Sequence, residues 1–307
     1  MKNRQLTLSV SSILRFAHNM NLKKAQKEFV QDLYDRKKSS LTASAYTKDL
    51  DQLIKYLFER GITAVEEVLP QHLEDFLQNL YDSKKLSPKS VSRKINSIKS
   101  FSNFLLTKNY LNKNPAKDIK HPQLETKTPK IFSKTECLAL RECARKDPKT
   151  HAMVELMLQT GIRISELAGM EVVHLDLGEP ATVFIPKRES QKERVIPLNN
   201  KAKETLKEFL EIGRQVESPF LFTTKSGKAI LIRNIRSSME RLFKRAGLKG
   251  AKVNDFRHTF TGRQLAMGVS LQTVCRVAGH KTLTTTEKYL KYMDIKKPGN
   301  KEVLEEL

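Results

Sequence analysis

The sequence lacks the apolar run that a membrane-spanning helix needs. No stretch of about 18 consecutive apolar residues occurs anywhere in it, which excludes a transmembrane helix. The first residues, MKNRQLTLSVSS, have a short basic start but neither the apolar stretch nor the small-residue cleavage site of a secretory signal. We therefore expect a cytoplasmic protein.

Cysteine is scarce as well, with only Cys137, Cys143 and Cys275 in the chain. The number is odd, and none of the three belongs to a C-x-x-C pair of the kind that holds zinc or forms a disulfide. We expect buried or inert thiols, and neither a disulfide framework nor a structural zinc site.

Acidic residues are too few to balance the basic ones: 34 Asp and Glu stand against 56 Lys and Arg, a formal charge of +22. Such a surplus repels itself unless an anion neutralises it. A basic surface that merely keeps the protein soluble is the alternative. The position of the charge favours nucleic acid, because residues 84–120 contain ten basic residues and a single acid, Asp118.

The 307 residues suffice for two domains, and the first has helical periodicity. Apolar positions recur at helical spacing around residues 22–36, 46–57 and 70–82, and Ser87 followed by Pro88 predicts the start of another helix. We expect residues 1–120 to form an all-helical DNA-binding bundle. One face of its last helix holds the basic residues expected to contact the DNA backbone, Lys89, Arg93, Lys94 and Lys99.

Residues 121–131 contain two prolines and no apolar period, which predicts a linker. Beyond it, Ser133 and Glu136 form a capping box that opens a helix, and two β-rich runs, ATVFIPK and KERVIPL, flank the polar turn RESQ as in a β-hairpin. The predicted fold class is mainly α: a helical domain and, over residues 132–307, a mixed α+β catalytic domain with a small antiparallel sheet, which together clamp DNA.

Four segments of the second domain carry groups suited to phosphoryl transfer. GIRISEL places Arg163 near a helix start with Glu166 one turn later to orient it, and arginine suits two-pronged contact with phosphate oxygens. The other three are the hairpin with Lys187, NDFRHTF with Asn254 and Arg257, and the Gly-His pair whose His280 precedes Tyr289 by nine residues. Each residue alone has an ordinary explanation, such as a solvated charge or a half-buried tyrosine.

The order and spacing of these pieces are more specific than any one of them. TGIRISEL, the hairpin with KER, FRHTF, AGH and TTxxY resemble the catalytic domain of the tyrosine-type site-specific recombinases of the phage integrase family, and are most similar to its Xer group. SPKSVSRKINSIKSFSNFLL followed by NPAKDI is similar to the SAM-like core-binding domain of that family. The resemblance covers residues 38–296.

The resemblance implies a role for each residue. Tyr289 would attack the scissile phosphate and leave a 3′-phosphotyrosyl link with a free 5′-hydroxyl. Arg163, Arg257 and His280 would stabilise the charge on the non-bridging oxygens of the transition state, and Lys187 would protonate the departing 5′-oxygen. Neither metal, ATP nor another cofactor is implied, and no cluster of carboxylates suggests a metal.

One position departs from the family pattern: Asn254 stands where a histidine commonly lies, three residues before the second arginine. An amide cannot take a proton near neutral pH. The activation of Tyr289 is then either slow, assisted by the substrate phosphate, or supplied by a partner. Two rival assignments also stay open, Lys192 in place of Lys187 as the acid and Tyr292 as the next candidate nucleophile.

The resemblance also implies double-stranded DNA with a short inverted repeat as the partner, bound by a tetramer of one or two recombinases. The C-terminal NKEVLEEL is either a tail that docks on a neighbouring protomer through a short helical face or a frayed end. A topoisomerase IB-like nicking-closing enzyme and a catalytically impaired DNA-binding accessory protein are the alternative functions. Chromosome or plasmid dimer resolution and mobile-element integration or excision both fit the sequence.

Overall fold

The computed structural model describes residues 20–82, 86–125, 128–188, 191–214 and 216–307. The chain divides into two compact units, residues 1–126 and residues 127–307, and each is described by itself. No helix among the described residues is long and apolar enough to cross a membrane.

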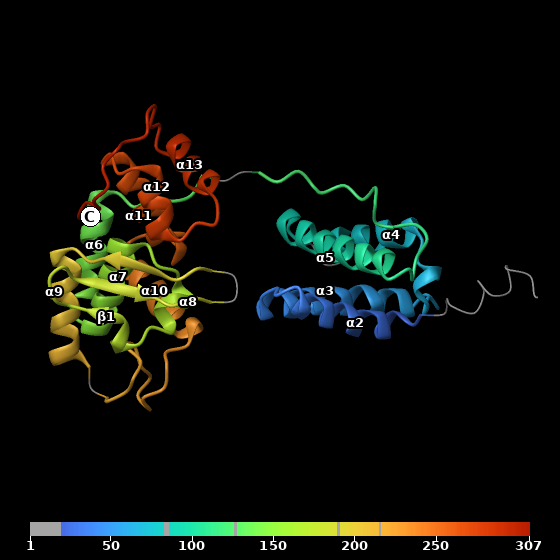
Figure 1. Cartoon of the computed structure of the whole chain (residues 1–307), viewed down its shortest axis with the longest axis horizontal. Coiled ribbons are helices and arrows are strands. Elements are labelled where there is room, and N and C mark those ends of the chain that lie inside the picture. Colours follow the sequence, from blue (N-terminus) through green and yellow to red (C-terminus); the bar gives the residue numbers. More distant parts are fainter. Residues whose placement is uncertain (1–19, 83–85, 126–127, 189–190, 215) are drawn as a thin grey trace, which may run out of the picture. The chain divides into compact units, whose positions relative to one another are not determined.

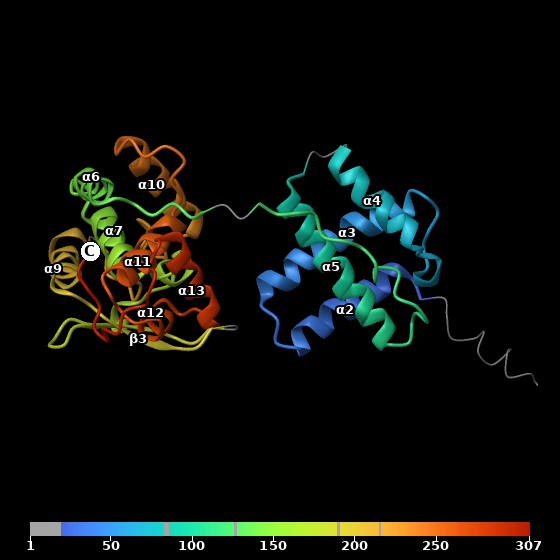
Figure 2. The same ribbon diagram turned by 90° about the horizontal axis from the view of Figure 1, so that it is seen from above.

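The first unit is a bundle in which one helix crosses two others. Its elements are α2 (Leu22–Asp35), α3 (Ser40–Phe58), the short 3-10 helix η2 (Val65–Glu67), α4 (Pro70–Asp82) and α5 (Pro88–Thr107). Helix α5 lies across α2 and α3 (Figure 1 and Figure 2), and buried Phe29, Leu50 and Phe104 fill the space between them. The predicted start of α5 is confirmed, because the Ser87 side chain caps the helix and Pro88 takes its first position.

The basic face predicted for α5 is wrong in one position. Lys94 is only 4% exposed, and its ammonium group lies 2.8 Å from Asp49 and 2.7 Å from Gln52, both on α3. Successive residues of a helix point about 100° apart, so Arg93 is exposed while Lys94 turns inward. A buried lysine needs a paired anion, which Asp49 supplies. Lys94 therefore stabilises the bundle and is not available to DNA.

The second unit is built around a buried helix and includes a small sheet. Its elements are α6 (Lys134–Ala144), α7 (Pro148–Thr160), α8 (Ile164–Ala168), η3 (Val172–His174), β1 (Leu175–Asp176), β2 (Thr182–Ile185), β3 (Arg194–Pro197), α9 (Asn200–Glu208), the π-helical turn η4 (Phe209–Gly213), α10 (Ile232–Arg245), α11 (Asn254–Ala266), α12 (Leu271–Ala278) and α13 (Leu283–Tyr292). Helix α7 is buried on nearly all sides and packs against α6, α9 and α11.

The predicted hairpin forms the sheet that carries part of the site. Strands β2 and β3 pair antiparallel with Ile185 opposite Arg194, and the short strand β1, which the sequence pattern did not predict, pairs with the outer edge of β2. Helix α12 packs against β3, and α11, α12 and α13 lie together (Figure 1). The ends of these elements gather the residues of interest from segments far apart in the chain.

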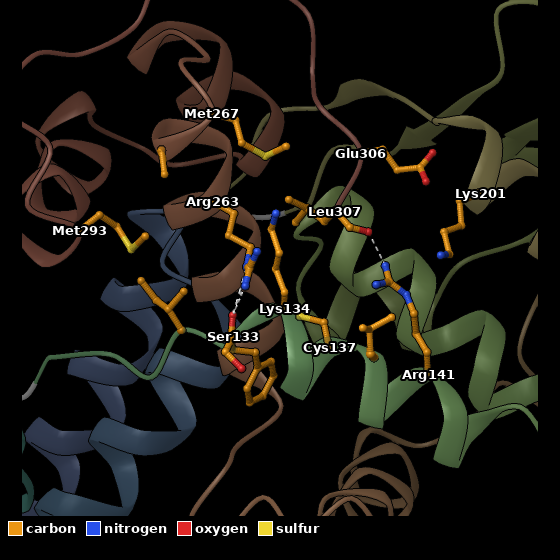
Figure 3. A pocket seen from close by; sticks show the side chains of 14 residues that line it. Ser133, Lys134, Cys137, Arg141, Lys201, Arg263, Met267, Met293, Glu306 and Leu307 are labelled. Carbon is orange, nitrogen blue, oxygen red and sulfur yellow. Dashed lines mark hydrogen bonds between the residues drawn. The ribbon is translucent and has the colours of Figure 1, made fainter.

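The C-terminal segment is extended and lies on its own unit. Lys301 exchanges backbone hydrogen bonds with Gly268 and Ser270, and the backbone of Leu307 bonds the side chain of Gln159. Arg141 also donates to the carbonyl oxygen of Leu307, beside a cavity of about 870 Å³ (Figure 3). Of the two alternatives for this segment, the short helical face is wrong, because glutamine and arginine side chains bond the backbone groups that a helix would have paired internally.

Candidate active site

The turn between α7 and α8 places the first arginine. Helix α7 ends at Gly161 with φ of +60°, and a Cβ at this glycine would lie 2.3 Å from the Phe260 ring. Glycine is therefore required for its conformation and for its small size. The chain then turns into α8 with Arg163 as the N-cap residue, so that the Arg163 guanidinium reaches the carbonyl oxygen of Gly279 at 2.6 Å.

Glu166 makes two hydrogen bonds with this arginine. Its carboxylate lies 3.1 Å from the Arg163 guanidinium and accepts the Arg163 backbone N–H at 2.8 Å. The carboxylate is buried, which raises its pKa, but its hydrogen bonds and charge interactions with Arg194 and Arg163 outweigh burial and hold the pKa below the usual range. Glu166 is therefore a charged anchor between two arginines.

Arg194 is a residue of the site that the sequence patterns did not single out. It lies at the start of β3, is 9% exposed, and makes two contacts with the Glu166 carboxylate, of 3.0 and 2.8 Å. Its third nitrogen donates to the carbonyl oxygen of Val277 at the end of α12. The only signal for Arg194 in the sequence is its place in KER. It ties the sheet, α8 and α12 together, and so fixes the position of Gly279 and the residue that follows it.

Arg257 is buried beside this cluster on the first turn of α11. One of its terminal nitrogens donates to the carbonyl oxygen of Gly161 at 2.8 Å, whereas the other, Nη2, has no hydrogen-bond partner among the described residues. Burial, with the nearby charge of Arg163, lowers the pKa of Arg257 to about 9, so the group is still charged at neutral pH. A buried cation with an unused donor is suited to an incoming anion.

His280 follows the left-handed Gly279 at the end of α12. Its Nδ1 lies 2.8 Å from the Thr286 hydroxyl, and its ring stacks on that of Tyr289 with centroids 6.3 Å apart. Burial and the surrounding arginines, Arg257 first, lower the pKa of His280 to about 3. His280 is therefore neutral in the free protein.

Tyr289 is buried on α13, only 6% exposed. Burial raises the pKa of Tyr289 to about 12, although the charge of Arg257 acts in the opposite direction. The phenol therefore keeps its proton in the free protein, and any reaction at its oxygen needs a proton acceptor. Tyr292 packs edge-on against it, with ring centroids 5.7 Å apart.

A hydrogen-bonded chain links three side chains at this point. The amide nitrogen Nδ2 of Asn254 lies 2.7 Å from Nε2 of His258, and Nδ1 of His258 lies 2.5 Å from the Tyr289 hydroxyl. His258 stands inside the FRHTF motif, but no pattern in the sequence assigned it a role. Asn254 thus reaches Tyr289 only through the histidine.

The two hairpin lysines make fewer contacts with the rest of the protein than the other residues of the site do. Lys187 and Lys192 are both exposed, and residues 189–190 at the tip lie outside the described part of the chain. Lys192 lines a cavity of about 530 Å³ together with Gly279 and His280. Lys187 makes no hydrogen bond or ion pair with the residues that the structure describes. The free protein therefore does not distinguish between the two lysines.

The site therefore gathers a buried phenol, two arginines and a histidine, and Arg257 has a donor without a partner among the described residues. Residues 131–294 match the phage integrase family, and residues 27–109 match the N-terminal SAM-like domain of phage integrases. The chain belongs to the phage integrase family and is a tyrosine recombinase, an enzyme that breaks and rejoins DNA.

Individual relatives agree with this assignment. The tyrosine recombinase XerC of Staphylococcus carnosus is 32% identical over 277 residues, which cover 87% of this chain and 92% of XerC. The fold is similar to that of a lambda integrase tetramer bound to a Holliday junction, with a TM-score of 0.72 at 15% identity over 93% of this chain and 81% of the integrase. It is also similar to that of XerH bound to a palindromic difH substrate, with a TM-score of 0.70 at 19% identity over 88% of this chain and 81% of XerH.

Proposed function

We propose that this recombinase cleaves DNA with Tyr289 as the nucleophile and forms a 3′-phosphotyrosyl intermediate. The phenol oxygen bonds to phosphorus, and the bond from phosphorus to the 5′-oxygen breaks. Because the phosphodiester energy is kept in the tyrosyl link, the released 5′-hydroxyl of another strand reverses the step and rejoins the DNA. Neither ATP nor a metal takes part in this scheme.

The observation that carries the proposal is the buried Arg257 with its unused Nη2 donor. A phosphate accepted there would lie among Arg257, Arg163 and the neutral His280. Fixed donors stabilise the extra charge of a pentacoordinate phosphate better than water does, because they need no reorganisation during the reaction. Glu166 acts through Arg163 by holding its guanidinium in place.

The test is covalent capture of DNA by matched tyrosine variants. Tyr289→Phe loses only the phenol oxygen, so it should bind the site with unchanged affinity and yield no covalent adduct on a nicked suicide substrate. Tyr292→Phe, three residues along the same helix, is the control and should retain adduct formation. An adduct formed by Tyr289→Phe but lost in Tyr292→Phe would transfer the role of nucleophile to Tyr292.

Lys187 is proposed as the general acid, with Lys192 as its rival. Replacing the lysine that protonates the 5′-oxygen by alanine should slow cleavage by about 100-fold or more. The defect should largely disappear when the bridging 5′-oxygen is sulfur, since a thiol with a pKa of about 8.5 leaves without a proton. Sulfur rescue of Lys192→Ala instead of Lys187→Ala would reverse the assignment, and rescue of neither would remove the acid from the hairpin.

The DNA partner and assembly follow from the family. The lambda integrase relative is a tetramer on a Holliday junction, and the XerH relative holds a palindromic substrate. We propose that this chain acts in the cytoplasm on an inverted repeat of double-stranded DNA, as a tetramer that joins two sites, with Lys89, Arg93 and Lys99 contacting phosphates. Cross-linking in the host followed by sequencing of the bound DNA would identify the paired half-sites. Relaxation of a supercoiled plasmid without any such site would indicate a topoisomerase instead.

A further inference from the structure

The chain of Asn254, His258 and Tyr289 supplies what the free tyrosine lacks. Nδ1 of His258 lies 2.5 Å from the phenol oxygen, within hydrogen-bond distance. The two residues are brought together by the packing of α11 on α13, and His258 is half-buried. A base must lie within hydrogen-bond reach of the proton that it removes, and His258 meets this condition before DNA arrives.

We propose that His258 is the general base that takes the proton of Tyr289, and that Asn254 is a positioning residue that orients the imidazole. This inference rests on the proposed role of Tyr289 as nucleophile. It assigns a catalytic function to a histidine that no sequence pattern singled out, and explains how a chain with asparagine at position 254 activates its phenol.

The step balances with the groups already named. As the oxygen of Tyr289 forms its bond to phosphorus, its proton moves to Nδ1 of His258, and the electron pair of the breaking bond leaves on the 5′-oxygen, which takes a proton from the hairpin acid. In the rejoining step the oxygen of the 5′-hydroxyl attacks phosphorus while its proton returns to the hairpin residue, and the imidazolium returns its proton to the departing phenol oxygen. One residue thus acts as base in cleavage and as acid in rejoining.

The role of Asn254 follows from the two ring nitrogens. For Nδ1 to accept a proton, the ring proton must lie on Nε2. The amide nitrogen of Asn254 faces Nε2 in the structure, and a half-turn of the amide, which exchanges its oxygen and nitrogen, places the carbonyl oxygen there as the acceptor. This resembles the way in which an acceptor behind a catalytic histidine fixes its tautomer in hydrolases. Asn254 does not contact the phenol and acts only through the ring.

The electrostatic surroundings keep the imidazole neutral. Burial, together with the positive charge of Arg257, lowers the pKa of His258, and Asp255 on the same helix opposes this shift. The rings of His280 and Tyr292 are the other titratable groups that face this part of the site, through their contacts with Tyr289. Because the base must be unprotonated, the rate of cleavage should rise with pH through the pKa of His258 and level off above it.

The experiment measures the single-turnover rate of covalent adduct formation against pH, with the full chain and a suicide substrate that carries a bridging 5′-sulfur. This substrate needs no leaving-group proton, so the rate reports activation of the nucleophile. His258→Gln should lose about 100-fold or more at neutral pH, together with the acid limb of the profile. His174→Gln, the same substitution at a histidine that contacts Glu171 and Phe184, is the control and should match the unsubstituted protein.

Asn254→Asp tests the positioning role and remains decisive if His258→Gln fails to fold, as judged by loss of DNA binding. A carboxylate behind the imidazole favours its protonated form, so the acid limb should move to higher pH while the plateau rate persists. A limb that belongs to a group other than His258 would not move.

Two results would overturn the inference. A His258→Gln protein that binds DNA and cleaves within a few-fold of the normal rate with its acid limb intact would show that the substrate phosphate or a partner takes the proton. An acid limb that does not move in Asn254→Asp would also overturn it. Neither result bears on the nucleophile, whose assignment depends on the Tyr289→Phe experiment alone.

Discussion

Replacing Arg194 by methionine should destabilise the second unit more than any ordinary surface change. The Glu166 carboxylate is 2% exposed and would lose both contacts with the Arg194 guanidinium. Removing one partner of a buried ion pair costs about 3–5 kcal/mol, because an uncompensated charge stays in the interior. Since Glu166 keeps Arg163 as a neighbour, we expect a loss near the lower end, about 3 kcal/mol.

The measurement is urea denaturation of the full-length chain, followed by hydrogen exchange in peptides from residues 127–307 so that the second unit reports by itself. Combining Arg194→Met with Glu166→Gln should restore part of the loss, because the buried carboxylate is then gone. Arg163 also loses its ion pair with Glu166, but its side chain is 25% exposed and can be solvated. Lys203→Met is the control: it removes an ion pair with the 80% exposed Glu179 and should cost less than about 1 kcal/mol.

The pH dependence has a definite sign. The pKa of Glu166 is lowered in the folded protein, so the unfolded chain binds this proton at a higher pH than the folded chain does. The stability that the pair contributes is therefore complete above the ordinary glutamate pKa and is lost as the pH falls through the lowered value. The difference between the unsubstituted protein and Arg194→Met should shrink in acid. A loss below about 1 kcal/mol at neutral pH, the range of a surface pair, would refute the reasoning.

The remaining predictions concern DNA contacts and a required glycine. Lys89→Ala should reduce the salt slope of DNA binding by about one unit. Lys94→Met should leave the slope unchanged and destabilise the first unit, because the buried Asp49 loses its ion pair with Lys94 and keeps the one with the exposed Arg93. Equal slopes for the two variants in binding titrations at several salt concentrations would contradict this. Gly279→Ala should cost more than the roughly 1–2 kcal/mol of a left-handed alanine, since its Cβ would lie 2.9 Å from the Arg194 guanidinium. The control, Gly247→Ala, has φ of +70° and open space around the added atom, and equal losses in denaturation of both variants would count against the proposed clash.

The sequence by itself was sufficient for whatever depends on neighbouring residues. Ser87 and Pro88 at the start of α5, the capping box of Ser133 and Glu136, and the β2–β3 hairpin are all set within a few residues of chain, because caps and turns satisfy their hydrogen bonds locally. The family was also apparent from the order of short motifs. The pairing of Arg163 with Glu166, three residues apart on one turn, belongs to the same class.

Only the tertiary structure decided the contacts between distant segments. Lys94 meets Asp49 across 45 residues of sequence, and His258 meets Tyr289 across 31. No periodicity distinguishes a lysine that turns into the bundle from its exposed neighbour Arg93, and no spacing shows that the histidine after Arg257 faces the tyrosine. The physical reason is that a buried polar group takes its partner from whichever element packs against it, and that choice is made when the helices pack.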